Sequence, residues 1–332
     1  MADAGLYIHI PFCEKRCLYC DFYTIAGSRN RIPDYIAALQ REIALRAAEK
    51  FWQRQKFATI FFGGGTPSLL SSQQIATILD CCFAHFKFNE VLEVTLEANP
   101  GTIDGKQMAN YRAVGINRLS LGVQSFEANE LKLLDRVHSP QQARLAAQHA
   151  RYAGFENLNL DFMFALPSQT RRRWQRTLQR AVALNPDHIS AYNLTHGYRH
   201  YEISNFAKPG YEAQHNIKYW DGSAYLGLGA SAHSFDGKRR FWNVANLRKY
   251  LDRLAENQLP EDGSEELTRQ QRMFEFAFLG LRQRRGIPLA EFARKFKQPF
   301  EQVFNGEIVK MEAQGLLVRE ADYFSERRNL PT

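Results

Sequence analysis

The stretch 7–22 reads YIHIPFCEKRCLYCDF and holds the most informative pattern in the chain. An apolar run typical of a buried β-strand leads directly into Cys13, Cys17 and Cys20. Three thiolates at this spacing can each bind one iron of a cubane cluster, which leaves the fourth iron open to a small chelating molecule. Structural zinc is the alternative, with His9 as a fourth ligand, although no second cysteine pair stands at zinc-finger spacing. The sequence therefore predicts a metal centre just after a strand.

Outward from this stretch, short apolar runs alternate with amphipathic segments over the first two-thirds of the chain. The predicted strands are 6–12, 58–62, 93–98, 118–124, 157–164 and 188–194, and the predicted helices between them are 33–50, 71–85, 104–114, 139–153 and 170–184. Such alternation indicates parallel strands joined by right-handed crossovers. Six units favour an open or partial barrel, and a doubly wound sheet is the alternative.

Polar and glycine-rich residues stand at the ends of these predicted strands. The second strand runs into the sequence GGGTP at 63–67, and Glu97, Gln124 and Asp161 lie near the ends of the third, fourth and fifth. In a barrel of parallel strands, functional residues gather at the carboxyl ends of the strands. GGGTP lacks both the Walker and the dinucleotide-binding patterns, so it is either a tight turn or a loop whose backbone approaches a ligand. The five strand ends together predict a single binding rim.

On these residues the chain resembles the radical-SAM superfamily and, within it, the coproporphyrinogen III oxidase-like group. It is most similar to the haem chaperone branch of that group. The matching segments are LEANPG, RLSLGVQSF, LDRVHS, ISAYNLT, HYEISNFAKPG, HNIKYW and YLGLGASAHSF. The resemblance implies a partial (β/α)6 barrel with a small helical, winged-helix-like domain at the C-terminal side.

The resemblance also implies cofactors and the residues that bind them. Cys13, Cys17 and Cys20 would ligate a [4Fe–4S] cluster whose open iron binds S-adenosylmethionine (SAM), with an electron donor as a partner. The SAM site would be lined by Tyr7 and Gly64, and Glu97 would accept hydrogen bonds from SAM. The positions that contact a second SAM in the coproporphyrinogen enzymes are occupied here by Tyr19, Gly65, Thr66, Gln124, Arg136 and Asp161.

Two departures favour the chaperone branch over the coproporphyrinogen enzymes. Phe22 stands where those enzymes carry a fourth cysteine, and only six residues precede Tyr7 where they have a long segment. His215, in the HNIKYW segment, matches a motif linked to haem binding, and Lys218 could pair with haem propionates. The predicted function is therefore delivery of haem to target proteins. The alternatives are a coproporphyrinogen III dehydrogenase and, with less support, a radical-SAM enzyme that modifies RNA.

The final part of the chain has a different pattern. Three helices are predicted at 272–281, 289–296 and 300–314, which gives a radical-SAM core at 1–256, a linker at 257–267 and a helical domain at 268–332. Compared with the family, the sixth barrel helix is expected to be missing near 195–197 and the tail to be short. A further difference is Ala165, because the family usually has a glycine before this Leu-Pro pair.

Composition narrows the possible roles. The chain has 332 residues, five cysteines and a formal net charge of +8. Without an apolar run long enough to span a membrane, and with an odd number of clustered cysteines, we expect a cytoplasmic protein without a disulfide framework. The basic residues are scattered and no aromatic-basic RNA motif occurs, so nucleic acid is not an expected partner. The oligomeric state is left open.

Overall fold

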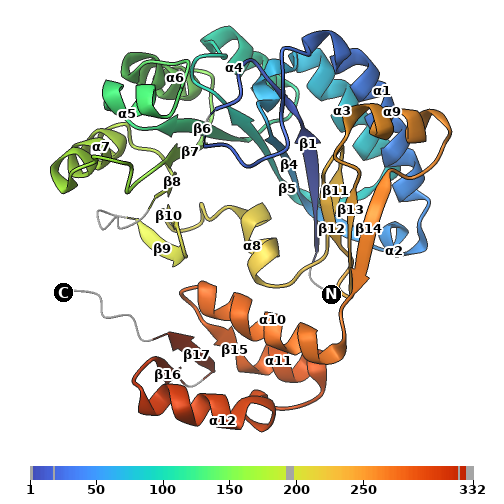
Figure 1. Cartoon of the computed structure of the whole chain (residues 1–332), viewed down its shortest axis with the longest axis vertical. Coiled ribbons are helices and arrows are strands. Elements are labelled where there is room, and N and C mark those ends of the chain that lie inside the picture. The colour runs from blue at the N-terminus through green and yellow to red at the C-terminus, as the bar shows by residue number, and fades with distance from the viewer. Residues whose placement is uncertain (1–2, 18, 192–197, 321, 327–332) are drawn as a thin grey trace.

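The computed structural model describes residues 3–17, 19–191, 198–320 and 322–326. Its centre is a 12-stranded sheet in the order β14-β13-β12-β11-β1-β4-β5-β6-β7-β8-β10-β9. The six predicted strands form its parallel part, with the bounds β1 Ala4–Ile10, β4 Lys56–Gly64, β5 Lys87–Ala98, β6 Arg118–Gln124, β7 Asn157–Phe162 and β8 His188–Ser190. Figure 1 shows this sheet curling into an open barrel, so the predicted fold class is confirmed.

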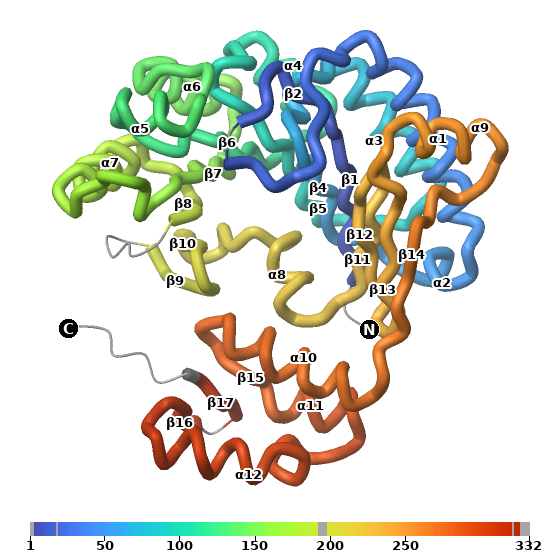
Figure 2. Tube along the Cα trace, viewed as in Figure 1, coloured from blue at the N-terminus to red at the C-terminus, as the bar shows by residue number. Residues whose placement is uncertain are grey.

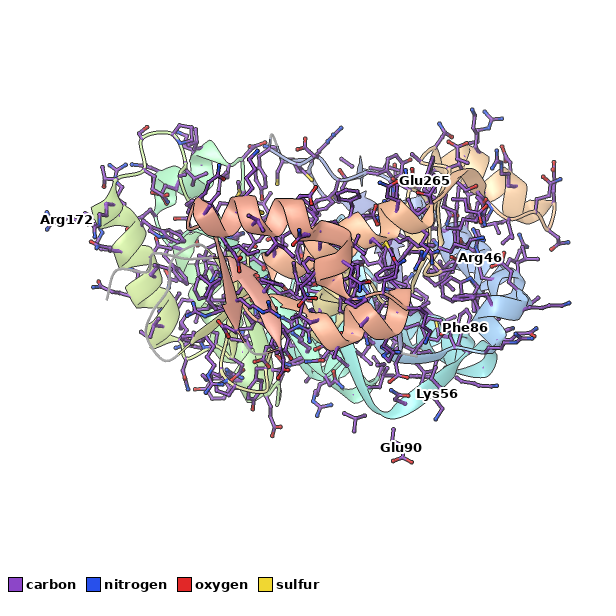
Figure 3. The ribbon with its side chains drawn as sticks, turned by 90° about the horizontal axis from the view of Figure 1, so that it is seen from below. Arg46, Lys56, Phe86, Glu90, Arg172 and Glu265 are labelled. Atoms are coloured by element: carbon purple, nitrogen blue, oxygen red, sulfur yellow. The ribbon has the colours of Figure 1, made fainter. Side chains whose placement is uncertain are left out.

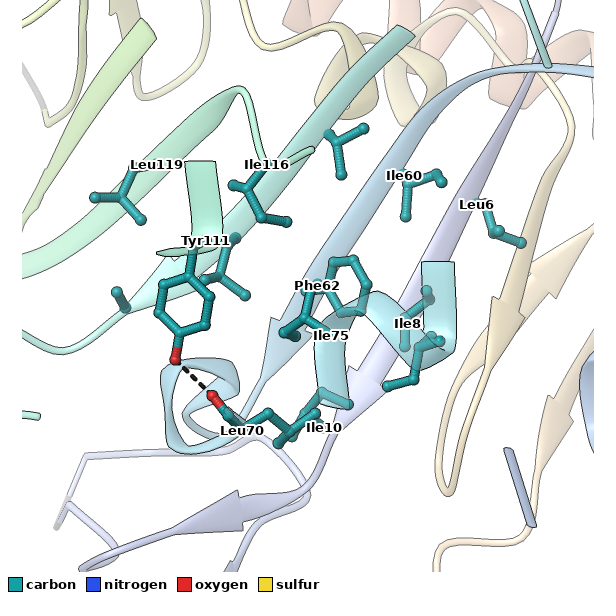
Figure 4. Packing of buried hydrophobic residues seen from close by; sticks show 14 of the residues in the cluster. Leu6, Ile8, Ile10, Ile60, Phe62, Leu70, Ile75, Tyr111, Ile116 and Leu119 are labelled. Carbon is teal, nitrogen blue, oxygen red and sulfur yellow. Dashed lines mark hydrogen bonds between the residues drawn. The ribbon is translucent and has the colours of Figure 1, made fainter. Parts of the chain in front are cut away.

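Helices cover the outer face of the parallel strands (Figure 2). They are α1 Ile32–Ala47, α2 Lys50–Gln53, α3 Ser72–His85, α4 Gly105–Ala113, α5 Ala128–Leu133, α6 Pro140–Tyr152 and α7 Arg171–Ala183. Capping boxes begin α3, α4 and α6, because Ser71, Asp104 and Ser139 each exchange hydrogen bonds with a glutamine three residues later. Figure 4 shows the apolar layer between helices and sheet, where the Tyr111 hydroxyl donates to the Leu70 carbonyl over 2.5 Å.

The inner face of the barrel is polar. Alternate residues of a strand point to the same face, so each parallel strand sends one set of side chains into the interior. These include Thr95 and Arg118, which are buried. The Nε atom of Arg118 is buried without a hydrogen-bond partner in the described structure. A polar interior of this kind indicates a barrel that binds a ligand.

The later strands are antiparallel to their neighbours, with one exception. Next to β8 lie β10 Asn205–Ala207 and β9 Arg199–Glu202, both antiparallel. On the other side of the barrel β11 Tyr225–Leu228 pairs in parallel with β1, and β12 His233–Phe235, β13 Arg239–Asn243 and β14 Glu261–Glu266 follow as antiparallel strands. Helix α8 Gln214–Trp220 precedes β11, and α9 Leu247–Ala255 joins β13 to β14. The predicted loss of a helix near 195–197 lies outside the described residues.

The structure corrects the predicted linker at 257–267. Residues 261–266 of this segment form β14, which pairs with β13 and makes the outermost strand at that edge of the sheet. Its side chains are almost all charged, because an edge strand in water needs no apolar face. Arg239 and Arg240 on β13 form ion pairs with Glu261 and Glu265 across the two strands. The polar composition of this segment is typical of a linker, but its backbone forms a strand.

The C-terminal domain is a separate small unit with its own core. It contains α10 Arg269–Arg282, β15 Ile287–Pro288, α11 Leu289–Phe296, α12 Phe300–Ala313, β16 Leu317–Glu320 and β17 Tyr323–Glu326. The three strands form an antiparallel sheet in the order β15-β17-β16, the arrangement of a winged helix. Phe276, Phe292, Phe300 and Phe324 pack in its core. In Figure 3, seen from below, this domain lies across the end of the barrel at which the parallel strands begin.

No helix among the described residues is both long enough and apolar enough to cross a membrane.

Candidate functional site

The cysteine loop leaves the barrel at the end of β1. Two short strands, β2 Phe12–Cys13 and β3 Ile25–Ala26, pair in parallel and close the base of the loop. His9 fixes the loop from below, since its Nε2 donates to the Tyr23 carbonyl over 2.9 Å. Burial lowers the pKa of His9 to about 4, so the ring is neutral and its Nδ1 accepts from the Tyr7 hydroxyl over 3.0 Å. The loop is therefore anchored at both ends.

The GGGTP loop packs directly against the cysteine loop. The amides of Gly65 and Thr66 donate to the carbonyls of Ile10 and Phe12, both over 2.8 Å. A Cβ atom on Gly65 would lie 2.7 Å from the Phe12 carbonyl oxygen and 3.0 Å from the Cys13 sulfur, so only glycine fits. The first alternative for GGGTP, a tight turn alone, does not account for this contact. The GGGTP loop therefore supports the start of the cysteine loop.

A cavity of about 300 Å³ opens between these two loops and the carboxyl ends of β5, β6 and β7. Every site residue predicted from the sequence lines it except Tyr7 and His215. The predicted residues that line it are Cys13, Cys17, Tyr19, Cys20, Gly64, Gly65, Thr66, Glu97, Gln124, Arg136 and Asp161. We refer to it as the cysteine cavity. Residues far apart in sequence therefore share one wall, as the barrel rule anticipated.

Two carboxylates form part of the cavity wall. Glu97 accepts a hydrogen bond from the Gly64 amide over 3.2 Å. Burial, with a further contribution from Asp161, raises the pKa of Glu97 to about 8. Asp161 is held by Ser120 and Asn159, whose side chains donate to its two oxygens, each over 2.7 Å. A cationic ligand in the cavity would stabilise the ionised form of Glu97. The carboxylate of Asp161, which its two donors hold in place, would lie beside the same ligand.

Arg136 connects the cysteine loop to the sheet. Its Nη2 donates to the Gly122 carbonyl over 2.8 Å, while its Nη1 lies 3.8 Å from the Cys17 sulfur and 3.4 Å from the Tyr19 hydroxyl. The same loop forms an ion pair from Lys15 to Asp135 at 2.5 Å. These contacts hold the cysteine loop against the rim of the sheet.

Some residues at this site were not predicted from the sequence. Ser120 and Asn159 orient Asp161. Their positions on the inward side of β6 and β7 are the feature of the sequence from which they could have been predicted. His138 bridges two rim segments, with its ring nitrogens 3.1 Å from Asn99 Oδ1 and 3.0 Å from the Val123 carbonyl. Gln124 was predicted, but not its backbone, which has a φ of 64°. Left-handed backbone at a residue other than glycine is strained and is concentrated at functional sites.

Tyr7 and His215 lie deeper in the barrel, outside the cysteine cavity. His215 is 1% exposed, and its Nδ1 and Nε2 lie 2.7 Å from Thr59 Oγ1 and 2.9 Å from the Tyr219 hydroxyl. Burial, with a smaller contribution from Lys218, lowers the pKa of His215 to about 3. Both nitrogens of a neutral ring are therefore engaged with protein partners. A metal could bind His215 only after Thr59 or Tyr219 moved away.

The three cysteines are the predicted metal ligands. All are free thiols that line the cavity. Thr66 Oγ1 donates to the Cys13 sulfur over 3.4 Å, which opposes the larger effect of burial in raising the pKa of Cys13. Within the described part of the chain, no three His, Cys, Asp or Glu side chains converge closely enough to hold one metal ion, which gives the zinc alternative no support. Thiolates on different irons of a cubane stand further apart than ligands of one ion.

Comparison with known proteins agrees with this geometry. Residues 7–181 match the Radical SAM superfamily and residues 267–325 match the HemN C-terminal domain. The chain belongs to the Radical SAM superfamily, a family that implies a [4Fe–4S] cluster and SAM.

Its relatives within that superfamily carry a more specific name. The chain is 33% identical to the heme chaperone HemW of Bacillus subtilis, with 94% of this chain and 92% of that protein covered. It is 35% identical to HemW of Escherichia coli, with 96% and 93% covered. Among solved structures, coproporphyrinogen III oxidase (HemN) of E. coli superposes with a TM-score of 0.84 at 25% identity, over 98% of this chain and 86% of that one.

Proposed function

We propose that this protein is a haem chaperone that carries a [4Fe–4S] cluster on Cys13, Cys17 and Cys20 and binds SAM at the open iron. The observation that carries the proposal is the convergence of these cysteines, the GGGTP loop and Glu97 on one cavity, in a chain whose relatives are named heme chaperones. Anaerobic reconstitution, with iron, sulfide and bound haem measured on the same sample, tests it. Uptake of zinc without sulfide would contradict the cluster, and failure to bind haem would contradict the chaperone role.

The residues of the cavity have separate tasks in this proposal. When bound, the cluster supplies an iron that chelates SAM and an electron for reductive cleavage of SAM. Gly65 lets the GGGTP loop approach Cys13, and Arg136 holds the cysteine loop against the sheet through Tyr19 and the Gly122 carbonyl. Glu97 accepts hydrogen bonds from SAM, and Tyr7 packs against Gly63, the neighbour of Gly64 at the end of β4.

A second SAM has a plausible set of contacts on the same rim. Tyr19, Gln124, Arg136 and Asp161 line the cavity beside Gly65 and Thr66. The carboxylate of Asp161 is held in position by two donors, so it can receive a cationic group without rearrangement. Equilibrium dialysis of labelled SAM against the cluster-loaded chain gives the number of molecules bound.

The superposition on HemN makes coproporphyrinogen III dehydrogenation the second candidate. Phe22, which takes the place of the fourth cysteine of those enzymes, lines the mouth of the cavity and is 65% exposed. An apolar side chain there cannot act as a cluster ligand or proton donor. Incubation with coproporphyrinogen, SAM and a reductant distinguishes the two, because protoporphyrinogen forms only with the enzyme.

The partners in this proposal are haem-receiving proteins and an electron donor, in the cytoplasm. The free cysteines suit a reducing compartment. The winged-helix-like domain offers nucleic acid little attraction, because α12, in the position of a recognition helix, carries Glu301, Glu307 and Glu312 against Lys310. His215 remains a proposed haem contact. Its test is a haem titration of His215→Ala, in which an unchanged spectrum and affinity would exclude it.

A further inference from the structure

Cys17 borders two openings of the protein surface. One is the cysteine cavity, and the other is a narrow crevice whose lining includes Lys15, Cys17, Thr66 and Val137. The crevice has a volume of about 10 Å³, room for about one water molecule. Small-molecule sites have volumes of roughly 300–1,000 Å³, so no cofactor or cargo can enter here. The crevice instead brings the protein surface close to a predicted cluster ligand.

The walls of the crevice are fixed by contacts between three segments: the cysteine loop, the turn after β5 and the segment after α5. Lys15 on the cysteine loop forms an ion pair with Asp135 after α5, at 2.5 Å. The same segment is held to the turn after β5 by His138, whose Nδ1 lies 3.1 Å from Asn99 Oδ1. A partner that docks at this surface therefore meets walls that are already ordered, which lowers the entropic cost of binding.

Apolar and cationic side chains share the surface around the crevice. Leu133 is 46% exposed and Val137 is 48% exposed. Lys132 and Arg16 are exposed beside them, on α5 and on the cysteine loop. We call this surface the loop face, and it consists of Lys15, Arg16, Lys132, Leu133 and Val137. Apolar contacts with a polar, charged rim are the usual composition of a protein–protein interface.

The charges of the loop face are positive on balance. Two of the neighbouring acids are neutralised, because Glu14 pairs with Arg29 and Asp135 pairs with Lys15. In the part of the chain that the structure describes, Asp21 is exposed without an ion pair, and so are the two cations Arg16 and Lys132 of the loop face. The whole chain, with a formal net charge of +8, has the same sign. Such a surface attracts and orients an acidic protein.

We propose that an acidic one-electron carrier protein docks on the loop face and reduces the cluster from the side of Cys17. This inference rests on the proposed function, which needs an electron donor and places SAM in the cysteine cavity. With that opening occupied, the crevice is the remaining close approach to Cys17 among the described residues. One electron leaves the reduced centre of the carrier and enters the cluster, and no covalent bond forms or breaks. Electron-transfer complexes bury little surface, less than about 1,200 Å², so a small patch of this kind is sufficient.

The test mixes the cluster-loaded full chain with a reduced acidic [2Fe–2S] ferredoxin and, separately, with dithionite, a small reductant that needs no docking surface. In the double variant Lys132→Glu, Val137→Ser we expect reduction by ferredoxin to slow at least about tenfold, while reduction by dithionite stays within about twofold of wild type. The affinity for oxidised ferredoxin, measured by isothermal titration, should fall by a similar factor.

The matched control is the double variant Lys56→Glu, Val91→Ser. It changes an exposed lysine near the start of β4 and a 90% exposed valine on β5, toward the other end of the barrel (Figure 3). Both ferredoxin measurements on this control should stay within about twofold of wild type. The single variant Lys132→Arg keeps the positive charge and should also retain the wild-type rate.

The outcomes separate the docking surface from the proposed function. If ferredoxin reduces the Lys132→Glu, Val137→Ser variant as fast as wild type, the loop face is wrong and the cluster stands. If wild type takes up no iron and sulfide and dithionite finds nothing to reduce, both proposals fail. Raising potassium chloride from 50 to 500 mM should slow reduction of wild type by ferredoxin roughly three- to tenfold, and a rate independent of salt would overturn recognition by charge. The two substituted side chains make no hydrogen bond or ion pair in the described structure, so thermal unfolding of the variant should match wild type.

Discussion

The cysteine cavity and a second cavity, which lies between the barrel and the C-terminal domain, have the same volume, about 300 Å³, but differ in the groups that line them. The wall of the first carries three thiols, the carboxylates Glu97 and Asp161 and the cations Lys15, Arg16 and Arg136. The wall of the second carries aromatic rings and the unpaired cations Lys218 and Arg272. Volume therefore says little about what a cavity binds, whereas unpaired charge says much. Thiols beside fixed carboxylates suit a cluster and a sulfonium cofactor in the first cavity.

The largest effect is expected from removing one cluster ligand. In Cys17→Ser the hydroxyl is a poor substitute for a thiolate, so iron and sulfide after anaerobic reconstitution should fall to near background. Cys81→Ser is the matched control, since Cys81 is also partly buried but lies on α3, away from the cavity. Iron and sulfide are measured chemically on both. Retention of a full cluster by Cys17→Ser would remove the basis of the first cavity's assignment.

The next effect concerns Glu97 and SAM. A hydrogen bond to a charged group contributes about 1.5–3 kcal/mol, so Glu97→Gln should weaken SAM binding by roughly 10- to 100-fold. Glu90→Gln is the control, because Glu90 is on the same strand and projects into solvent in Figure 3. Isothermal titration of the cluster-loaded protein measures both. An unchanged affinity in Glu97→Gln would place SAM elsewhere.

The pH dependence of stability follows from the same carboxyl. Its pKa in the folded chain is about 8, above its ordinary value of 4.5. A group whose folded pKa is raised contributes stability that is fully present below its unfolded pKa and is lost as the pH rises through the folded one. The contribution of Glu97 to the free energy of unfolding of the cofactor-free chain should therefore fall between about pH 4.5 and 8, against the opposite trend from buried histidines such as His9 and His138, whose pKa values are lowered to about 4. In Glu97→Gln this part of the slope should disappear. Urea titrations across that range would contradict the assignment if the two slopes were equal.

Local sequence patterns were sufficient for most of the fold and of the cysteine cavity. The strands and helices have clear periodicity, and Cys13, Glu97 and Asp161 stand at strand ends, where parallel topology brings them together. Strand β14 was not predicted, because an exposed edge strand has no buried face and its sequence therefore shows no alternation of apolar residues. The second cavity could not be predicted, because Lys218 and Arg272 on its two sides come from different domains and no spacing along the chain relates them.

The smallest predicted effect concerns Ala165, at the rim two residues after Met163 of the cysteine cavity. Ala165 stands where the resemblance to the family implies a glycine, and its φ of 55° lies in the left-handed region that favours glycine. An L-residue with a side chain costs about 1–2 kcal/mol in that conformation, and the greater freedom of glycine in the unfolded chain offsets part of the gain. Ala165→Gly should therefore raise the free energy of unfolding by about 0.5–1 kcal/mol. Ala153→Gly is the control, because Ala153 has a φ of −76° and should lose stability instead. Urea unfolding gives both values, and a loss in Ala165→Gly equal to that of Ala153→Gly would show that the turn at the rim does not require this backbone.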